Sequence, residues 1–306
     1  MLRKHRREWR KSISTNKVES RYTHHPWRAL LVILGIVPVS YCLVGLVLFG
    51  ILRLPMDLSN MESFSTIIVF TVGNFMAYVL APFFLHIPNG RRSFREYLDD
   101  IHLTITQPIF KLFLLTISCV LILILCQGTF SIIYRIGEGN PITRDFVFGV
   151  FNLSLAFPPA SMLLIAQFYS MFEEVALRGV FLTMLLKKNT QRMAIIYSAL
   201  AFGMLHLLAL FIGNDLIHTL GQAVWAFLFG LFYGYLFIKS GSLLPPMIIH
   251  WLSNVFQAPL TAYYQKASAA VIASGGIFGY GLAAILLILW VRFFAARWLN
   301  PVKARE

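Results

Sequence analysis

The chain has 306 residues, of which 58% are hydrophobic and 13% are charged. Soluble globular proteins carry roughly 25% charged residues, so the composition excludes an ordinary soluble domain and indicates an integral membrane protein. The net charge of +13 is explained by basic cytoplasmic loops and by attraction to anionic lipid, and we expect no nucleic-acid partner.

The N-terminal stretch MLRKHRREWRKSISTNKVESR is basic and has no apolar core. It is therefore not a secretory signal peptide. We expect a cytoplasmic arm over residues 1–28 that is attracted to the headgroups of anionic lipid.

Eight apolar segments follow the arm. A membrane helix needs about 20 mostly apolar residues. The candidate spans are 29–52, 66–85, 108–132, 159–186, 194–212, 219–238, 243–260 and 270–291. The shorter apolar segment 146–157 predicts a partial or interfacial helix before the fourth span. The sequence therefore predicts an all-α, polytopic membrane protein.

The loops predict the orientation of these spans, because Lys and Arg favour the cytoplasmic side. Basic residues gather in the N-terminal arm, in the second, fourth and sixth loops, and in the C-terminal tail. Eight spans with both termini in the cytoplasm satisfy this pattern. The strong charge bias and the lack of a targeting segment fit a bacterial inner membrane, and the absence of repeats fits one membrane domain.

Five polar side chains within the predicted spans are candidates for a functional site. Of the thirteen acidic residues only Glu173 and Glu174 lie within a predicted span, in the stretch MFEEVALRGVF. His206 and His250 also lie inside spans, and Asn254 follows His250 by one turn. An ionisable residue at membrane depth costs about 2.5–3.5 kcal/mol or more, so such residues usually mark function. A lone histidine more often bonds two helices, but the whole set indicates a functional site.

The predicted span ends place this set in one layer. At about 1.5 Å per residue, the polar groups lie roughly 10–20 Å below the cytoplasmic surface. Three helices that converge there would enclose a polar cavity open to the cytoplasm.

Helix geometry divides the two glutamates. Glu174 and Arg178 are four residues apart, so they can form an ion pair on one helix face. The side chain of Glu173 points about 100° away from that of Glu174, which leaves its carboxylate free for chemistry.

The residue types fit amide hydrolysis without a covalent intermediate. A carboxylate shielded from water is a useful general base, and a nearby histidine can share the proton of an activated water. A second histidine and an asparagine can donate hydrogen bonds to a developing oxyanion. Alternatively, Glu173, His206 and His250 could hold a zinc ion, because three protein ligands suffice. The sequence leaves both open, although the asparagine and the Glu–Arg pair favour the metal-free arrangement.

Other intramembrane protease chemistries lack their signatures. The chain has no HExxH zinc motif and no GxSxG serine elbow. No aspartate falls within a predicted span, which excludes a membrane aspartyl dyad.

Three short motifs, in order and each in a separate span, carry a resemblance to a known family. EEVALR fits the pattern EExxxR, FGMLH fits FxxxH and HWLSN fits HxxxN. With these motifs the chain resembles the CAAX prenyl endopeptidase and bacteriocin-processing (CPBP, Abi-type) family of intramembrane proteases. The resemblance covers about residues 159–260, and the first three spans carry no motif of the family.

The resemblance implies a helical fold with a cytoplasm-facing cavity and a role for each motif residue. Glu173 would be the general base, with His206 as its partner in activating water. His250 and Asn254 resemble the oxyanion-stabilising pair. The family is described as both metal-dependent and glutamate-dependent, so zinc remains possible. The residues that look supporting are Glu174, Arg178 and Phe202.

The resemblance also predicts the domain organisation. Residues 1–28 form the basic arm, 29–158 the N-terminal helices, 159–260 a CAAX-protease-like catalytic core, and 261–306 the last helix and tail. The implied partner is a membrane-embedded or lipidated peptide or protein. Eukaryotic members remove three residues from prenylated CAAX proteins. In a bacterial membrane the analogy instead favours peptide processing, bacteriocin immunity or maturation of anchored proteins.

Three other functions fit the same polar layer. A non-catalytic binding or immunity protein would use the cavity to recognise a peptide or partner. A transporter would use the Glu–His layer as a proton relay, but it would favour related halves with discontinuous helices, and no repeat is visible. The layer could also be a purely structural polar cluster.

Overall fold

The computed structural model describes residues 22, 24–54, 63–90, 93–105, 107–137, 139, 141–150, 165, 167–264 and 281–299. In these ranges the chain forms helices and turns, and no strand occurs. Most of the expected N-terminal arm, the expected starts of the fourth and last spans, and the C-terminal tail from residue 300 lie outside the described residues.

Six helices of the described ranges are long and apolar enough to cross a membrane. Each of them overlaps one of the predicted spans, which confirms an all-α, polytopic membrane architecture. The predicted number of eight is not confirmed by this criterion. The six helices are Pro26–Ile51, Phe64–Phe84, Ile109–Gly137, Gln191–Phe211, Leu216–Ser240 and Gly281–Trp298.

The fourth and seventh predicted spans are also helical, but they carry the polar motifs. The fourth corresponds to α9 (Ser170–Glu174), η4 (Val175–Leu182) and α10 (Thr183–Lys188) in one continuous run. The seventh corresponds to α13 (Leu244–Tyr264). Charged side chains in the first, and His, Asn, Gln and Pro in the second, lower the hydropathy of these two helices.

Helix ends differ from the predicted ends in several places. The helix α6 (Ile109–Gly137) runs five residues past the predicted end at residue 132, and α15 (Gly281–Trp298) runs past residue 291. The expected interfacial helix begins as α7 (Arg144–Val150), and its continuation lies outside the described residues. The short helix α5 (Phe94–Asp100) was not predicted, because a capping box and not an apolar run defines it.

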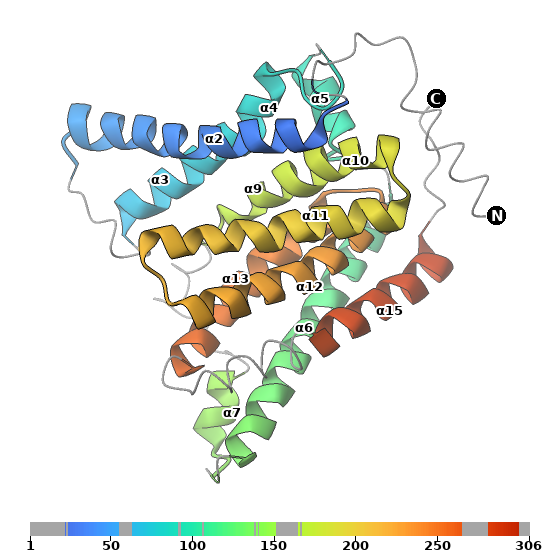
Figure 1. Ribbon diagram of the computed structural model, residues 1–306. Helices are drawn as coiled ribbons and strands as arrows, with labels where there is room; N and C mark the ends of the chain where they lie inside the picture. Colours follow the sequence, from blue (N-terminus) through green and yellow to red (C-terminus); the bar gives the residue numbers. More distant parts are fainter. Residues whose placement is uncertain are drawn as a thin grey trace.

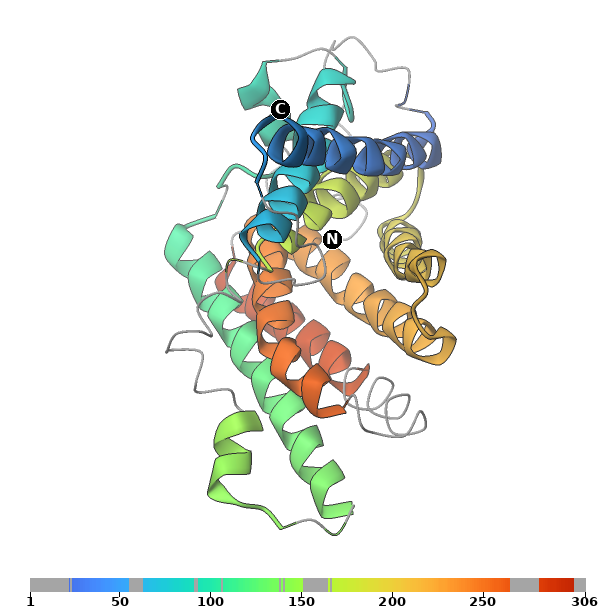
Figure 2. The same cartoon turned by 90° about the vertical axis from the view of Figure 1, so that its left-hand side faces the viewer.

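The other helices surround the continuous run α9–η4–α10, which carries Glu173, Glu174 and Arg178. The first helices are α2 (Pro26–Gly45), η1 (Leu46–Ile51), α3 (Phe64–Phe75), η2 (Met76–Leu80) and α4 (Ala81–Phe84). The next pair is α11 (Gln191–His206), continued by η5 (Leu207–Ile212), and α12 (Leu216–Ser240). Figure 1 shows α2 and α3 at the upper left and α11 beside α12 across the middle. Figure 2 shows α6, α13 and α15 in the lower half of the molecule.

The η4 helix is the centre of this arrangement. It contacts α2, η2, α11 and α12, while α9 just before it packs against α13. All eight residues of η4 are buried. A charged residue in η4 therefore has neither water nor lipid beside it.

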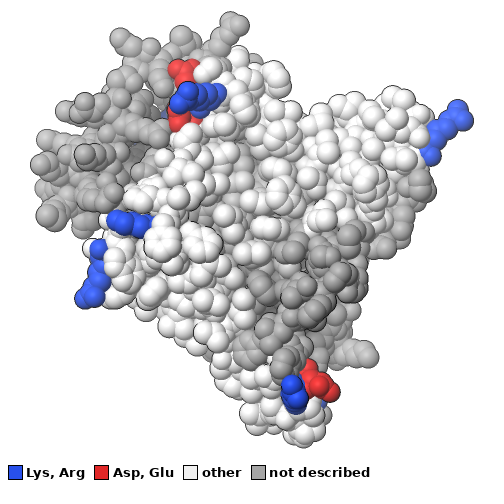
Figure 3. Space-filling model, turned by 180° about the vertical axis from the view of Figure 1, so that it is seen from behind, with Lys and Arg blue, Asp and Glu red and all other residues white. Residues whose placement is uncertain are grey.

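The outer surface fits a lipid environment. On α2, for example, Leu31 is 67% exposed and Val39 64% exposed. Figure 3 shows that, on the face opposite to that of Figure 1, the charged side chains of the described residues lie near the edges around a broad uncharged area. Exposed apolar area of this extent favours contact with lipid.

Small residues let α11 and α12 approach closely. A Cβ atom on Gly203 would lie 2.8 Å from the carbonyl oxygen of Ala223, and one on Gly230 would lie 2.8 Å from the Cα atom of Ala199. Close backbone approach at small residues is a main source of helix association in membranes.

We predict that Gly203→Ala lowers the stability of the bundle. The added methyl group has to displace α12, and overpacking of this kind costs about 1–3 kcal/mol. Gly221→Ala is the matched control, because nothing lies within 4 Å of a Cβ atom there. It should be neutral or stabilising by up to about 1 kcal/mol. Thermal unfolding of both variants in detergent measures the difference, and equal melting temperatures would contradict the prediction.

Candidate functional site

The site is built around a π-helical segment. The η4 helix follows the two glutamates directly and contains Arg178. Two hydroxyl groups bond to carbonyl groups of this segment: Ser198 Oγ donates to Leu177 O at 3.1 Å, and Thr183 Oγ1 donates to Arg178 O at 3.3 Å. Segments with π-helical pairing are frequent at functional sites.

The ion pair predicted from the sequence is present. Arg178 Nη1 donates to Glu174 Oε1 at 2.7 Å, and both side chains are completely buried. Arg178 Nη2 donates to the carbonyl oxygen of Gly230 at 3.3 Å. The guanidinium lies 4.7 Å from the ring centre of Phe202 and 5.4 Å from that of Tyr233. Aromatic faces and a carboxylate thus surround the positive charge.

His250 joins the same carboxylate. Its Nδ1 atom lies 2.9 Å from Glu174 Oε1, and the histidine is 2% exposed. Its ring stacks on Tyr233 with 5.3 Å between the ring centres. Tyr233 is held in turn by a hydrogen bond with Ser253 Oγ, and Ser253 Oγ donates to the backbone oxygen of His250. Glu174, Arg178 and His250 therefore form one buried network.

Glu173 lies beside this network and does not join it. Its side chain is partly buried. It is close enough to His250, Glu174 and Arg178 to interact with their charges. Its carboxylate makes no hydrogen bond within the described part of the chain. This arrangement agrees with the division of the two glutamates derived from helix geometry.

His206 is oriented by its own helix. Its Nδ1 atom lies 2.9 Å from the carbonyl oxygen of Phe202. Because a carbonyl oxygen only accepts, Nδ1 carries a proton and Nε2 remains available. His206 interacts electrostatically with His250 and Arg178. Among the described residues no hydrogen bond joins it to Glu173, although both side chains lie near the same network.

Asn254 and Phe202 complete the predicted set. Asn254 is partly buried one turn after His250, and its amide makes no hydrogen bond among the described residues. Phe202 is completely buried, and its ring centre lies 4.9 Å from that of His206 and 5.4 Å from that of His250. Phe202 therefore separates and packs the two histidines.

Sequence reasoning missed three supporting residues. Gly230 accepts a hydrogen bond from Arg178, Tyr233 stacks on His250, and Ser253 bonds both Tyr233 and the backbone of His250. Gly230 and Tyr233 are three residues apart on one helix, which is a weak signal of a shared face. Only the packing of α12 on the site shows their role.

The described residues contain no group of three His, Cys, Asp or Glu side chains that could hold a metal ion. The zinc site considered above, with Glu173, His206 and His250 as ligands, is therefore not preassembled. Both histidines do use Nδ1 for an oxygen and leave Nε2 available, an orientation that suits water, substrate or a metal.

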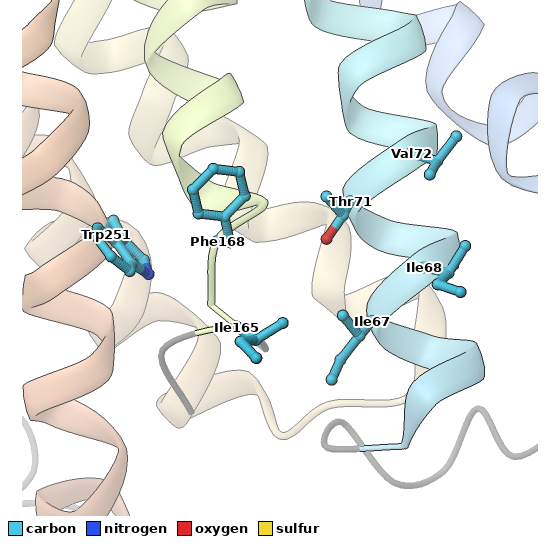
Figure 4. Close-up of a pocket in the computed structure, with 7 residues that line it drawn as sticks. All are labelled: Ile67, Ile68, Thr71, Val72, Ile165, Phe168 and Trp251. Carbon is cyan, nitrogen blue, oxygen red and sulfur yellow. The ribbon is translucent and has the colours of Figure 1, made fainter. Parts of the chain in front are cut away.

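An apolar pocket of about 440 Å³ lies next to the site. Ile67 and Thr71 of α3 face Phe168 and Trp251 across it (Figure 4). Its walls are apolar except for Thr71, whose hydroxyl group is buried without a hydrogen-bond partner in the described structure. Trp251 follows His250 on α13, and Phe168 packs against both Trp251 and Phe172, the residue before Glu173, so the pocket is lined by the helices that carry the site.

Comparison with known proteins tests the family resemblance seen in the three motifs. Residues 155–256 match the family model described as "Type II CAAX prenyl endopeptidase Rce1-like". The resemblance to the CAAX prenyl endopeptidases is thereby confirmed. A match to this family indicates CAAX intramembrane protease activity, and all the motif residues fall within the matched range. Neither the curated proteins nor the solved structures give a match.

We predict that the two adjacent glutamates respond differently to the same substitution. Glu174→Gln removes the negative charge that balances Arg178, and breaking a buried pair costs about 3–5 kcal/mol. Glu173→Gln breaks no hydrogen bond in the described structure and should change stability by less than about 1 kcal/mol. Chemical or thermal unfolding of both variants in detergent measures this. Equal losses would show that Glu173 is also structural.

Proposed function

We propose that the chain is an intramembrane endopeptidase that hydrolyses a peptide bond in a membrane-associated or lipidated protein or peptide. The observation that carries the proposal is the buried Glu174–Arg178–His250 network with the unbonded carboxylate of Glu173 beside it. The family match supports protease activity in general. We propose the roles of the individual site residues, the substrate class and the mechanism.

Glu173 and His206 activate water in this proposal. The Glu173 carboxylate takes a proton from water while the water oxygen attacks the scissile carbonyl carbon. The side chain of Glu173 is partly buried beside the Glu174–Arg178–His250 network, and partial shielding from water strengthens a carboxylate as a base. His206 Nε2 shares the proton and later helps to pass it to the leaving nitrogen, whose bond to carbon then breaks. Water or substrate bridges the two side chains, because no direct hydrogen bond joins them in the described structure.

His250 and Asn254 stabilise the developing oxyanion. With a proton on each ring nitrogen, His250 donates through Nδ1 to Glu174 and through Nε2 to the oxyanion. The Asn254 amide is the second donor, one helical turn further on. Donors held in place before the reaction are the main source of transition-state stabilisation in acyl transfer. Arg178 and Phe202 keep this set in place.

The apolar pocket supports a substrate that is apolar next to its scissile bond. Its volume is suited to a large side chain or part of a lipid group. We further propose the cell membrane as the location, with both termini cytoplasmic and the N-terminal arm on anionic lipid. The basic loops support this orientation.

We predict that purified protein cleaves members of a library of prenylated or lipid-anchored peptides. Glu173→Gln should reduce the rate by about 10²–10⁴, the contribution typical of a general base. Glu96→Gln is the matched control, because Glu96 caps α5 away from the site. Mass spectrometry of the products measures the rate and locates the cleaved bond.

A chelator arm tests the metal alternative in the same assay. Cleavage that persists with chelator and disappears in Glu173→Gln supports a metal-free, glutamate-dependent protease. Loss with chelator, with recovery on adding zinc, favours zinc. Folded protein that cleaves no peptide but still binds one would replace the proposal with the binding or immunity function.

A further inference from the structure

Two tyrosines from the N-terminal helices, and a third just before the two glutamates, lie near Glu173. Tyr169 precedes Glu173 by four residues in the same helical run. Tyr78 lies on η2 and the ring of Tyr41 (α2) rests on Gly73 of α3, and both η2 and α3 pack against α9, which carries Glu173. All three tyrosines also interact electrostatically with Glu173. Tyr41 and Tyr78 belong to spans that lie outside the matched range and carry no family motif.

The cluster is held in a defined geometry. The Tyr41 hydroxyl group donates to Asn74 Oδ1 at 2.6 Å, and Asn74 is 1% exposed. A Cβ atom on Gly73 would lie 2.3 Å from Tyr41 Cδ1, so the tyrosine ring rests directly on the backbone of α3. Phe70 packs against both Tyr41 and Tyr169, with ring centres 5.2 and 5.5 Å away. These contacts fix α2, α3 and the start of α9 together.

One face of the second span joins this cluster to the apolar pocket. Ile67, Thr71, Asn74 and Tyr78 follow one another at intervals of four, three and four residues, which is the spacing of one helix face. Ile67 is 8% and Tyr78 9% exposed, whereas Phe75 between them is 37% exposed. Ile67 and Thr71 point toward Phe168 and Trp251 (Figure 4). The face therefore runs from an apolar end to a polar end beside Glu173.

The polar end has hydrogen-bonding capacity to spare. Among the described residues, the hydroxyl groups of Tyr78 and Tyr169 have no hydrogen-bond partner. A hydroxyl group both donates and accepts, so it can pair with either the N–H or the C=O group of a peptide. A peptide group that enters an apolar region needs such partners, because an unpaired buried group is costly.

We propose that this face of the second span is the substrate-binding wall of the site. Tyr78 and Tyr169, supported by the Tyr41–Asn74 pair, position the peptide backbone at Glu173. The Ile67–Thr71 end receives an apolar side chain that flanks the scissile bond. The inference rests on the proposed function for the position of the scissile bond.

The decisive variant is Tyr78→Phe, which removes one hydroxyl group and keeps the ring. We expect kcat/KM to fall about 10–100-fold, as for loss of one hydrogen bond to a reacting peptide. Tyr97→Phe is the matched control, since Tyr97 is a buried tyrosine on α5 outside the cluster. It should leave kcat/KM within twofold of wild type. A decrease of less than twofold in a folded Tyr78→Phe variant would overturn the proposal.

A separate variant tests the role of the apolar pocket. Thr71→Phe fills the apolar end, so cleavage of peptides with a bulky apolar residue beside the scissile bond should fall at least tenfold relative to peptides with alanine there. The alanine peptides serve as the folding control within the same variant. An equal effect on both peptide series would overturn the assignment of the pocket.

A binding measurement separates this inference from the proposed function. Fluorescence anisotropy reports the Kd of a labelled lipid-anchored peptide for Glu173→Gln and for Glu173→Gln with Tyr78→Phe. We expect Tyr78→Phe to weaken binding about 3–10-fold. If Tyr78→Phe weakens binding in this way but the wild-type protein cleaves no peptide, the protease function would be rejected and the substrate-binding wall would be retained. If Tyr78→Phe leaves the Kd unchanged, or if neither variant binds the peptide, the assignment of the substrate-binding wall would be overturned.

Discussion

The guanidinium of Arg178 lies fully buried at the centre of the helix bundle, where water cannot screen its charge. Glu174 balances that charge at 2.7 Å, and the same oxygen accepts a hydrogen bond from His250. Breaking such a buried pair by removing one partner is far more costly than at a surface, so the pair fixes the positions of the helices that carry it. The arrangement of α9, η4, α12 and α13 depends on this network.

The network explains why the protein retains two adjacent glutamates at membrane depth. One glutamate is committed to structure, because Arg178 and His250 share its carboxylate. The other, Glu173, is one position earlier on the helix and points elsewhere, so it remains available for water or substrate. The π-helical form of η4 belongs to the same arrangement, since hydroxyl groups of Thr183 and Ser198 bond to its carbonyl groups.

Residue spacing predicted the local parts of this site, and packing determined the rest. The Glu174–Arg178 pair follows from an interval of four residues, and the apolar lengths of six spans identified six membrane helices. The contact between Glu174 and His250 joins residues 76 positions apart, and no spacing rule reveals it. The close contact of the Tyr41 ring with the backbone at Gly73 likewise depends on how α2 packs against α3. Two predicted spans do not meet the hydropathy criterion because charged residues in one, and His, Asn, Gln and Pro in the other, lower their mean hydropathy.

The proposed mechanism assigns structural and chemical roles to different polar residues of the site, and its central claim concerns Glu173. A single turnover in H₂¹⁸O, with enzyme in excess over a lipid-anchored peptide, tests it most directly. If Glu173 activates water as a base, the new carboxylate of the product carries one ¹⁸O atom in the first turnover. If Glu173 instead attacks the peptide and forms a mixed anhydride, and water then attacks the Glu173 carbonyl carbon, the first product takes an unlabelled oxygen from the enzyme. Unlabelled first product would contradict the account.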